Sequence, residues 1–433
     1  MKPLPKKNDT VSVLGLGRSG MAVVEYFVRR GMRVCVYDDA SEEALGERAR
    51  RLRDLGVPLF SGDKEIGGDF VFRSPAVRPD ERRLCRAALR GSQVMGEAEL
   101  FALLSPAPVY AVSGSDGKTT TSLFLARLLE SAGRRVYLGG NIGRSLLPFL
   151  DEIKEGDVCV LELSSFQLMD FDTPLALGVL TNLSPNHLNW HKDMKEYTAA
   201  KYRLAALSHR RVLHAGLFPS LSGVRFSYEE GADYFVKNGV LWGRGVPLCR
   251  ESDVRLSGRH NAENLLAAAA ATEGVITPAA LKTVAKGFKG APYRLELEGK
   301  CRGVCFYNSS IDTSPARTAV SLAALKERHE RILLLLGGRG KGLSFAPLAE
   351  AVAAFGARPY LFGEARDEIG AALSQKGVSY TAADTMEKAT RLAFADADEG
   401  DAVLLSPACT SFDAYADFEA RGEAFRYTVK SLM

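Results

Sequence analysis

Val109-Tyr-Ala-Val-Ser-Gly114-Ser-Asp-Gly117-Lys118-Thr119-Thr120-Thr121 is the stretch that decides the fold of the middle of the chain. An apolar run suited to a buried strand leads into a short glycine loop, and residues 123–130 continue in a helical pattern. Glycines let backbone N–H groups close around phosphate oxygens at a helix N-terminus. Lys118 adds a positive charge there, and the Thr119 hydroxyl can reach Mg²⁺. We therefore predict a nucleotide triphosphate site, in a shortened loop because Val112 stands where the general pattern has its first glycine.

Strand-like apolar runs alternate with helical patterns along the chain, at 11–14, 33–37, 109–112, 158–163, 332–336, 360–362 and 403–405. This alternation predicts the α/β class, with parallel sheets covered by helices. Strands run into glycine turns at Gly15, Gly114 and Gly337, which indicates three sheets with ligand loops at their carboxyl ends. We predict three domains: an N-terminal Rossmann-like domain at 1–96, a central P-loop ATPase domain with a parallel sheet at 97–290, and a C-terminal Rossmann-like α/β domain at 291–433.

Composition narrows the function classes. A chain of 433 residues is too long for one hydrophobic core, which agrees with several domains. The net charge of +4 is small and the two signs are interspersed, so we expect no nucleic-acid partner. No apolar run approaches the roughly 20 residues of a membrane helix, and the N-terminus lacks a signal-peptide pattern, so we expect a cytoplasmic protein. The seven scattered cysteines favour reduced thiols.

A second buried strand, 158–162, ends on the carboxylate of Glu162 and is followed by Leu-Ser-Ser-Phe-Gln167. In P-loop enzymes a carboxylate at such a position lies near the metal. The alternative is an acid that caps the following helix. Beside the loop at 114–119, the metal interpretation is the better one.

His187 and His191 lie four residues apart, which by itself would suit zinc. Position 188 is Leu, however, and the Glu that follows the first His of zinc hydrolases is missing, so His187 fits Mg²⁺ or a structural role better. Lys201 follows on a helical pattern among small and aromatic neighbours. Most helical lysines are solvated, and only desolvation would lower the pKa of Lys201 enough to give a neutral amine.

Near the N-terminus, Gly15-Leu-Gly17-Arg-Ser-Gly20 follows a strand and opens a helix, and a second strand ends at Asp38-Asp39. This fingerprint indicates a diphosphate-bearing ligand at a helix N-terminus with an acid nearby. The ligand can be a dinucleotide or a nucleotide sugar. An NAD-dependent oxidoreductase would leave Lys118, Glu162, His187 and Lys201 without a role.

In this order and over nearly the whole chain, the motifs resemble the Mur ligases, ATP-dependent amide-forming enzymes of peptidoglycan synthesis. The family-wide pieces are Gly114–Thr119, Glu162–Gln167, Asn186-His187-Leu with Ala-Ala-Lys201, and Gly258-Arg-His-Asn261-Ala-Glu-Asn264. The N-terminal glycine loop and Leu405-Ser-Pro-Ala-Cys-Thr-Ser411, with Phe418-Glu-Ala-Arg-Gly422 beyond it, are similar to the branch that adds D-glutamate.

The resemblance implies an N-terminal domain for the uridine diphosphate sugar, a central ATPase domain, and a C-terminal domain that binds the amino acid and closes over the site. The implied ATP-binding residues are Gly114, Ser115, Asp116, Gly117, Lys118, Thr119, Thr120, Asn261, Asn264, Arg294 and Ser309. Those implied for the sugar nucleotide are Leu16, Arg18, Ser19, Asp38, Ser74, Asn141, Ser164 and Gln167. Those implied for D-glutamate are Thr313, Lys341, Ser411, Phe412 and Phe418.

By the same resemblance, Lys118, Glu162, His187 and Lys201 would be the catalytic residues. Thr119, Glu162, His187 and a carbamylated Lys201 would hold two Mg²⁺ ions. The expected reaction joins D-glutamate to UDP-N-acetylmuramoyl-L-alanine through an acyl phosphate at the expense of ATP, in a monomeric enzyme.

Three positions depart from the family's common wording. Asn186 and Asn189 stand where many members have Asp, and Ser309 stands where an Asp would help to bind ATP. Asp312, three residues further on, is a candidate for supplying that charge. The departures leave a catalytically impaired nucleotide-binding homologue open as an alternative, beside another amide ligase of the same superfamily.

Overall fold

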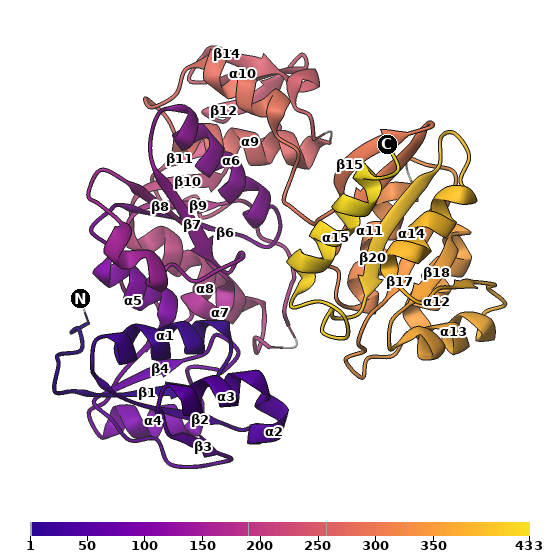
Figure 1. Cartoon of the computed structure of the whole chain (residues 1–433). Helices are drawn as coiled ribbons and strands as arrows, with labels where there is room; N and C mark the ends of the chain where they lie inside the picture. The colour runs from indigo at the N-terminus through magenta and orange to yellow at the C-terminus, as the bar shows by residue number, and fades with distance from the viewer. Residues whose placement is uncertain (1, 189, 257, 327) are drawn as a thin grey trace. The chain divides into compact units, whose positions relative to one another are not determined.

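The computed structural model describes residues 2–188, 190–256, 258–326 and 328–433. The chain divides into two compact units, Met1–Phe288 and Lys289–Met433, called unit 1 and unit 2 below. Unit 1 holds two sheets and unit 2 holds one (Figure 1). The predicted α/β class with three sheets is confirmed. The boundaries predicted at residues 96 and 290 stay a prediction, because the first two sheets belong to one unit.

The N-terminal sheet is fully parallel and has the order β3-β2-β1-β4-β5. Its strand order reverses between β1 and β4, and in open α/β sheets ligands bind at the carboxyl ends beside such a point. Its strands are β1 (Thr10–Leu14), β2 (Arg33–Asp38), β3 (Leu59–Ser61), β4 (Phe70–Arg73) and β5 (Gln93–Gly96), and its helices are α1 (Arg18–Arg29), α2 (Glu42–Leu45), α3 (Glu47–Asp54) and α4 (Arg82–Leu89).

The central sheet has nine strands in the order β14-β13-β12-β11-β10-β9-β6-β8-β7; the pairs β12–β13 and β13–β14 are antiparallel and the other pairs are parallel. Its strands are β6 (Val109–Ser113), β7 (Val136–Gly140), β8 (Val158–Glu162), β9 (Leu175–Leu180), β10 (Ser208–His214), β11 (Val224–Phe226), β12 (Tyr234–Lys237), β13 (Val240–Gly243) and β14 (Val246–Arg250). The helices of this region are α5 (Glu97–Leu104), α6 (Lys118–Ser131), η1 (Leu147–Glu152), α7 (Ser165–Leu168), α8 (Met194–Leu207), η2 (Glu251–Asp253), α9 (Arg259–Ala271) and α10 (Pro278–Gly287).

Local sequence explains the centre of this sheet. Every residue of β8 is buried, as expected for an apolar strand covered on both faces. Helix α9 packs against α6 and against the strands of the sheet, and its alanine run 267–271 is almost completely buried. Helix α9 brings Asn264 beside the glycine loop that begins α6, and the Thr121 hydroxyl donates to the Asn264 side-chain oxygen at 3.2 Å.

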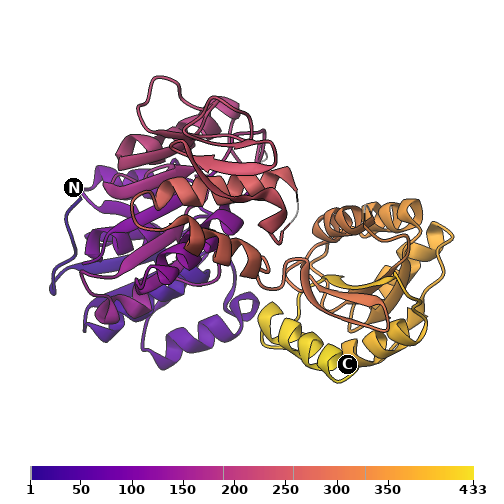
Figure 2. The same ribbon diagram turned by 90° about the horizontal axis from the view of Figure 1, so that it is seen from above.

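Unit 2 has a six-stranded sheet in the order β15-β16-β20-β17-β18-β19, parallel except for β15. Helices α11, α12 and α13 cover one face and α14 and α15 the other, each over its own apolar cluster (Figure 2). The elements are β15 (Glu296–Cys301), β16 (Val304–Asn308), α11 (Pro315–Lys326), β17 (Ile332–Gly337), α12 (Ala346–Phe355), β18 (Arg358–Phe362), α13 (Arg366–Gln375), β19 (Thr381–Ala382), α14 (Met386–Ala395), β20 (Ala402–Ala408) and α15 (Phe418–Lys430).

The seven cysteines are free thiols. Within the described part of the chain, none of the helices has the length and apolar character that a membrane span requires.

The two sheets of unit 1 meet at a buried joint. Helix α1 faces α5 and η1 there (Figure 1). Glu97, at the start of α5, is 5% exposed and accepts a hydrogen bond from the Ser145 hydroxyl. Burial raises the pKa of Glu97 to about 7, although the Ser145 hydrogen bond acts in the opposite direction. The neighbouring Glu99 is paired with Lys2 at 2.8 Å.

The buried Glu97 predicts a specific pH dependence of stability. Because the folded carboxyl holds its proton up to about pH 7 and the unfolded one only up to about 4.5, the folded state binds more protons in this window, and stability falls as pH rises through it. Glu97→Gln removes this loss, so the difference in free energy of unfolding between the variant and the wild type should grow by roughly 3 kcal/mol across the window. Urea denaturation at several pH values measures it.

The matched control is Glu47→Gln, which changes an exposed carboxylate at the start of α3. Its pH profile should run parallel to that of the wild type. A Glu97→Gln profile that is also parallel would contradict the raised pKa.

Candidate active site

The glycine loop 114–117 joins β6 to α6 as predicted. Gly114 and Gly117 have φ values of 149° and 76°, which favour glycine. A Cβ atom at Gly114 would lie 1.9 Å from the Thr181 hydroxyl, and one at Gly117 would lie 2.2 Å from the Asn264 side-chain oxygen. Both positions therefore require glycine for space as well as for conformation.

The segment after β9 supports this loop. The Asn182 side chain accepts the Asp116 N–H at 2.8 Å, and its amide donates to the Asp116 carbonyl at 3.1 Å. Ser115 is 3% exposed; its N–H donates to Asn182 O, and its hydroxyl lies 2.9 Å from Ser184 O and 2.8 Å from the Tyr197 hydroxyl. The Ser115 side chain, predicted to contact ATP, thus connects the loop to Ser184 and to Tyr197 of α8. Thr120 lies half-buried in the first turn of α6.

Two lysines converge on one carbonyl oxygen. Lys118 Nζ donates to Gly114 O at 3.0 Å and to Ser115 O at 2.7 Å. Lys201, on α8 and 2% exposed, donates from Nζ to the same Gly114 O at 2.9 Å and to Ser113 Oγ at 2.8 Å. Burial lowers the pKa of Lys201 well below its ordinary value, and the nearby Lys118 charge lowers it further. The desolvation that would distinguish Lys201 from an ordinary helical lysine is present.

Beside the loop, three polar side chains form a chain of hydrogen bonds. Thr119 Oγ1 donates to Glu162 Oε2 at 2.7 Å, and Asn141 Nδ2 donates to Glu162 Oε1 at 2.6 Å. The alternative that Glu162 caps the next helix is wrong, because Ser164 is the N-cap of α7 and forms a capping box with Gln167. Glu162 is 2% exposed and needs polar partners at its carboxylate, which these two residues supply.

The two histidines face different surroundings. His187 is exposed, has a φ of 55°, and packs its ring edge-on against Phe166 at 4.9 Å between centroids. Partial desolvation and the charges of Lys118 and Lys201 lower its pKa. His191 is 2% exposed and lies between Ser165 Oγ and Glu196. Among the described residues, His, Cys, Asp and Glu side chains do not come together in groups of three or more that could hold a metal ion.

The residues predicted for the sugar nucleotide lie at the carboxyl ends of strands in both sheets of unit 1: Leu16, Arg18, Ser19, Asp38 and Ser74 at β1, β2 and β4, and Asn141, Ser164 and Gln167 after β7 and β8. Asp38 accepts the Leu16 N–H at 2.6 Å, and Ser74 lies so near Gly15 that a Cβ there would be 2.7 Å from the Ser74 Cβ. Arg18 and Ser19 begin α1, and the Arg18 guanidinium donates to the carbonyl of Gly143. That contact places α1 beside the turn that carries Asn141.

In unit 2, some of the predicted residues come together and others do not. Lys341 Nζ donates to Thr313 Oγ1 at 2.9 Å, and Ser411 is 2% exposed. Phe412 is 61% exposed, and Phe418 packs near Tyr293 at the start of α15. Arg294, predicted to contact ATP, is exposed.

Comparison with known proteins shows the family. Family models match the MurD-like N-terminal domain of Mur ligases at residues 9–96, the Mur ligase middle domain at 112–213, and the Mur ligase glutamate ligase domain at 293–409. A protein of Clostridium perfringens named UDP-N-acetylmuramoylalanine–D-glutamate ligase is 36% identical over 98% of this chain and 97% of its own length. A protein of the same name from Ruminiclostridium cellulolyticum is 34% identical over the same shares. The chain belongs to the Mur ligase family.

Solved structures agree with the fold of this Mur ligase. UDP-N-acetylmuramate-alanine ligase MurC from Thermotoga maritima is 19% identical and gives a TM-score of 0.58 over 98% of this chain and all of its own. A pseudomurein peptide ligase type C from Methanothermus fervidus is 18% identical, with a TM-score of 0.52 over 98% of this chain and 100% of its own. At these identities the likeness concerns the fold alone.

Ser309, one of the three positions that depart from the family's common wording, lies in a buried cluster of hydroxyl groups. Ser309 is fully buried; its hydroxyl accepts the Leu295 N–H at 3.2 Å and lies 3.4 Å from Ser321 Oγ, which donates to Asp312 Oδ2 at 2.6 Å. A second carboxylate at position 309 would thus share one buried hydroxyl cluster with Asp312. The Ser309 hydroxyl points into unit 2 in this Mur ligase, and Asn189 lies outside the described residues.

Sequence reasoning missed several residues that shape the site. Ser113 and Asn182 hold Lys201 and the loop, and each was findable only as a polar residue at the end of a buried strand. Arg421 is fully buried and donates to the carbonyls of Ser310, Cys409 and Thr410. Its place in Phe418-Glu-Ala-Arg-Gly422 is the sequence signal for this residue.

The close packing of Gly140 against the end of β8 at Glu162 can be tested by substitution. Gly140 has a φ of 94°, and a Cβ there would lie 2.4 Å from the backbone oxygen of Glu162. Gly140→Ala should cost about 1–2 kcal/mol of stability from the left-handed backbone and about 1–3 kcal/mol more from the clash. Gly133→Ala is the control, because Gly133 has a φ of 77° and open space. Denaturant titration measures both, and equal losses would contradict the packing.

Proposed function

We propose that this Mur ligase adds D-glutamate to UDP-N-acetylmuramoyl-L-alanine with ATP, forming ADP, phosphate and an amide in cytoplasmic peptidoglycan precursor synthesis. The observation that carries the proposal is the convergence of Lys118 and Lys201 on the Gly114 carbonyl, beside Thr119 and Glu162. The near full-length similarity to proteins named for this reaction supports the choice of substrates.

The residues beside the loop fit Mg²⁺. Hydroxyl and carboxylate oxygens are the ligands this ion prefers, and Thr119 and Glu162 present them 2.7 Å apart. Thr119, Glu162, His187 and a carbamylated Lys201 would hold two ions. When bound, the ions would neutralise charge on the triphosphate and on the phosphoryl group in transfer.

Carbamylation of Lys201 has chemical support. A neutral amine adds to carbon dioxide to form an N–C bond and releases one proton, leaving an anionic carbamate. The lowered pKa of Lys201 favours the neutral amine. A carbamate keeps a single N–H, so only one of the two present hydrogen bonds, to Ser113 or to Gly114, would persist.

Two steps account for the reaction. The alanyl carboxylate attacks the γ-phosphorus of ATP, which releases ADP and gives an acyl phosphate; the D-glutamate amine then attacks the acyl carbon and expels phosphate. Lys118, at the helix N-terminus, stabilises the negative charge of the transferring group. The loop N–H groups and α6 orient the phosphates, with the nucleotide further contacted by Asp116, Asn261, Asn264 and Arg294.

Substrate binding falls to both units. Leu16, Arg18, Ser19, Asp38, Ser74 and Asn141, with Ser164 and Gln167, would contact the uridine diphosphate sugar. Thr313, Lys341, Ser411, Phe412 and Phe418 would contact D-glutamate. Lys341 is a cation whose ammonium is already oriented by Thr313, which suits a carboxylate partner.

The test is phosphate release from ATP and Mg²⁺ with UDP-N-acetylmuramoyl-L-alanine, with and without D-glutamate, and the product identified by mass. We expect release that requires both substrates, and an amide product. ATP binding without turnover would favour the impaired homologue. Turnover with another amino acid would favour a different amide ligase of the family.

Lys201 gives a second test. Lys201→Ala should be inactive at saturating substrates and regain part of its activity with added acetate or propionate, because a short carboxylate replaces the carbamate anion. Lys195→Ala, which changes an exposed lysine of the same helix, should retain wild-type activity. Full activity of Lys201→Ala without added carboxylate would contradict the assignment.

A further inference from the structure

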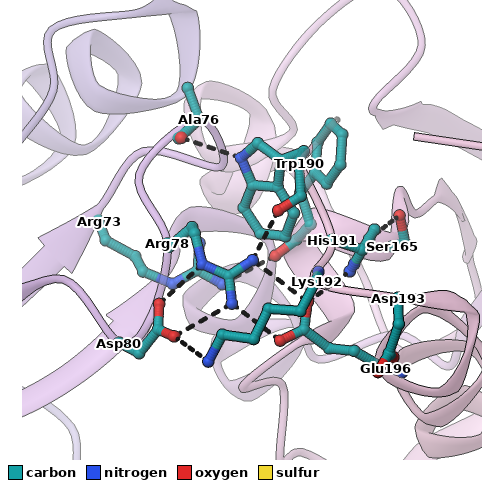
Figure 3. Close-up of polar contacts among 11 residues, drawn as sticks. Arg73, Ala76, Arg78, Asp80, Ser165, Trp190, His191, Lys192, Asp193 and Glu196 are labelled. Atoms are coloured by element: carbon teal, nitrogen blue, oxygen red, sulfur yellow. Dashed lines mark hydrogen bonds and ion pairs between the residues drawn. The ribbon is translucent and has the colours of Figure 1, made fainter. Parts of the chain in front are cut away.

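Five residues from two separate stretches of unit 1 form a connected polar cluster, here called the Arg78 cluster: Arg78, Asp80, Trp190, Lys192 and Glu196 (Figure 3). Arg78 and Asp80 lie in the loop that follows β4 of the N-terminal sheet, and the other three lie between His187 and the first turn of α8. The cluster thus joins the two sheets of unit 1.

Arg78 makes most of the links. Its Nη2 and Nη1 donate to the two carboxylate oxygens of Glu196 at 2.8 and 3.2 Å, and Nη1 also donates to Trp190 O at 2.6 Å. Its Nε and Nη2 donate to Asp80 at 2.8 and 3.1 Å. The guanidinium carbon lies 5.0 Å from the centre of the Trp190 ring. A planar fork that meets a carboxylate at two points fixes orientation as well as distance.

Two more contacts connect the same stretches. Lys192 pairs with Asp80 at 2.7 Å, and the Trp190 indole N–H donates to Ala76 O at 3.2 Å. An isolated surface ion pair stabilises little, but Arg78 and Glu196 are only 23% and 19% exposed and belong to a network. The hydrogen bond from Arg78 also lowers the pKa of Glu196 to about 2, so this carboxylate is charged at neutral pH.

The cluster supports the turn of His187. The N–H groups of Trp190 and His191 donate to His187 O at 3.0 and 2.9 Å. Glu196 accepts from His191 Nδ1 at 3.1 Å, and His191 Nε2 lies 2.9 Å from Ser165 Oγ. Because a carboxylate only accepts, the neutral ring carries its proton on Nδ1.

The cluster also supports the start of α8. Glu196 lies in the first turn of this helix, next to Tyr197, whose hydroxyl meets Ser115 of the glycine loop. Lys201 follows further along the same helix. A displacement of Glu196 would therefore move the support of the loop and the helix that carries Lys201.

From these contacts we infer that Arg78 is a positioning residue, which holds the His187 turn and the start of the Lys201 helix in place from the N-terminal sheet. The inference rests on the proposed function. Ser74, at the site proposed for uridine diphosphate, begins the loop that holds Arg78. A ligand that orders this loop also orders the His187 turn, so the sugar-nucleotide site and the metal site are coupled.

The kinetic test compares Arg78→Met with Arg82→Met. Arg82 lies just beyond the same loop, and its pair with Asp63 is exposed on both sides. Arg78→Met should lower kcat by about 10- to 100-fold, the usual effect of losing a residue that orients a metal ligand, and leave KM for D-glutamate unchanged. Arg82→Met should behave as the wild type. Equal kcat for the two variants, with both folded, would overturn the inference.

The spectroscopic test does not depend on turnover. The chain has two tryptophans, Trp190 and Trp242. Trp242→Phe removes a buried indole N–H that has no hydrogen-bond partner in the described structure, and leaves Trp190 as the sole emitter. In this background Arg78→Met should shift Trp190 emission and Arg82→Met should not. Added UDP should change Trp190 emission only when Arg78 is present, with UDP binding followed separately by calorimetry.

The outcomes separate the two proposals. If the wild type makes no amide, the proposed function fails while the emission shift still decides the role of Arg78. If the amide forms but Trp190 emission and its response to bound UDP are the same with and without Arg78, the positioning role is overturned and the proposed function stands. A calorimetric titration without UDP binding would overturn the coupling.

Discussion

The Gly114 carbonyl oxygen accepts hydrogen bonds from two lysines, and the rest of the site depends on that convergence. It is possible only because Gly114 has no Cβ, which would otherwise meet Thr181, and because α8 brings Lys201 beneath the loop. Two charged ammonium groups at one buried carbonyl would carry the free-energy cost of desolvation and of like-charge repulsion. Lys118 is half-buried and Lys201 is almost fully buried, and this burial lowers the pKa of Lys201 well below its ordinary value, which favours the neutral amine.

The stretch from residue 181 to the end of α8 supplies several of the residues around the Gly114 carbonyl. Residues 181–184 hold the glycine loop, the next residues carry His187, and α8 then supplies Tyr197 and Lys201. Because these elements are contiguous, whatever fixes the stretch fixes the loop and the lysine together. The Arg78 cluster connects this stretch to the loop that follows β4 of the N-terminal sheet.

In unit 2, a single buried arginine holds several strand ends together. Arg421 is fully buried and is hydrogen-bonded to main-chain carbonyls at the carboxyl ends of β16, β17 and β20. Burial lowers its pKa to about 10, so it still carries its charge at neutral pH. A buried cation held by carbonyl dipoles ties the three strand ends together, in the region where Thr313, Lys341 and Ser411 lie.

The sequence by itself determined the α/β class, the three sheets, the glycine loop and the carboxylate of Glu162 at the end of a buried strand, whereas a role for Lys201 was implied only by the family resemblance. These follow from local patterns: apolar runs of strand length, glycines where φ is positive, and polar residues at strand ends. Glu162 could be left as a metal ligand or a helix cap, since both put a carboxylate after a strand. The structure excludes the helix cap, because Ser164 occupies the N-cap position of α7.

Only the tertiary structure showed which residues that are far apart in the sequence contact one another. It placed Ser115 behind the loop, turned the Ser309 hydroxyl toward Ser321, and joined Arg78 to Glu196 across two sheets. Arg78, Glu196 and Ser321 have no local pattern that sets them apart from ordinary polar surface residues, and the motifs that contain Ser115 and Ser309 do not show where their hydroxyls point. Their roles come from burial and from the direction of a hydrogen bond, which depend on how the sheets pack and not on the order of neighbouring residues.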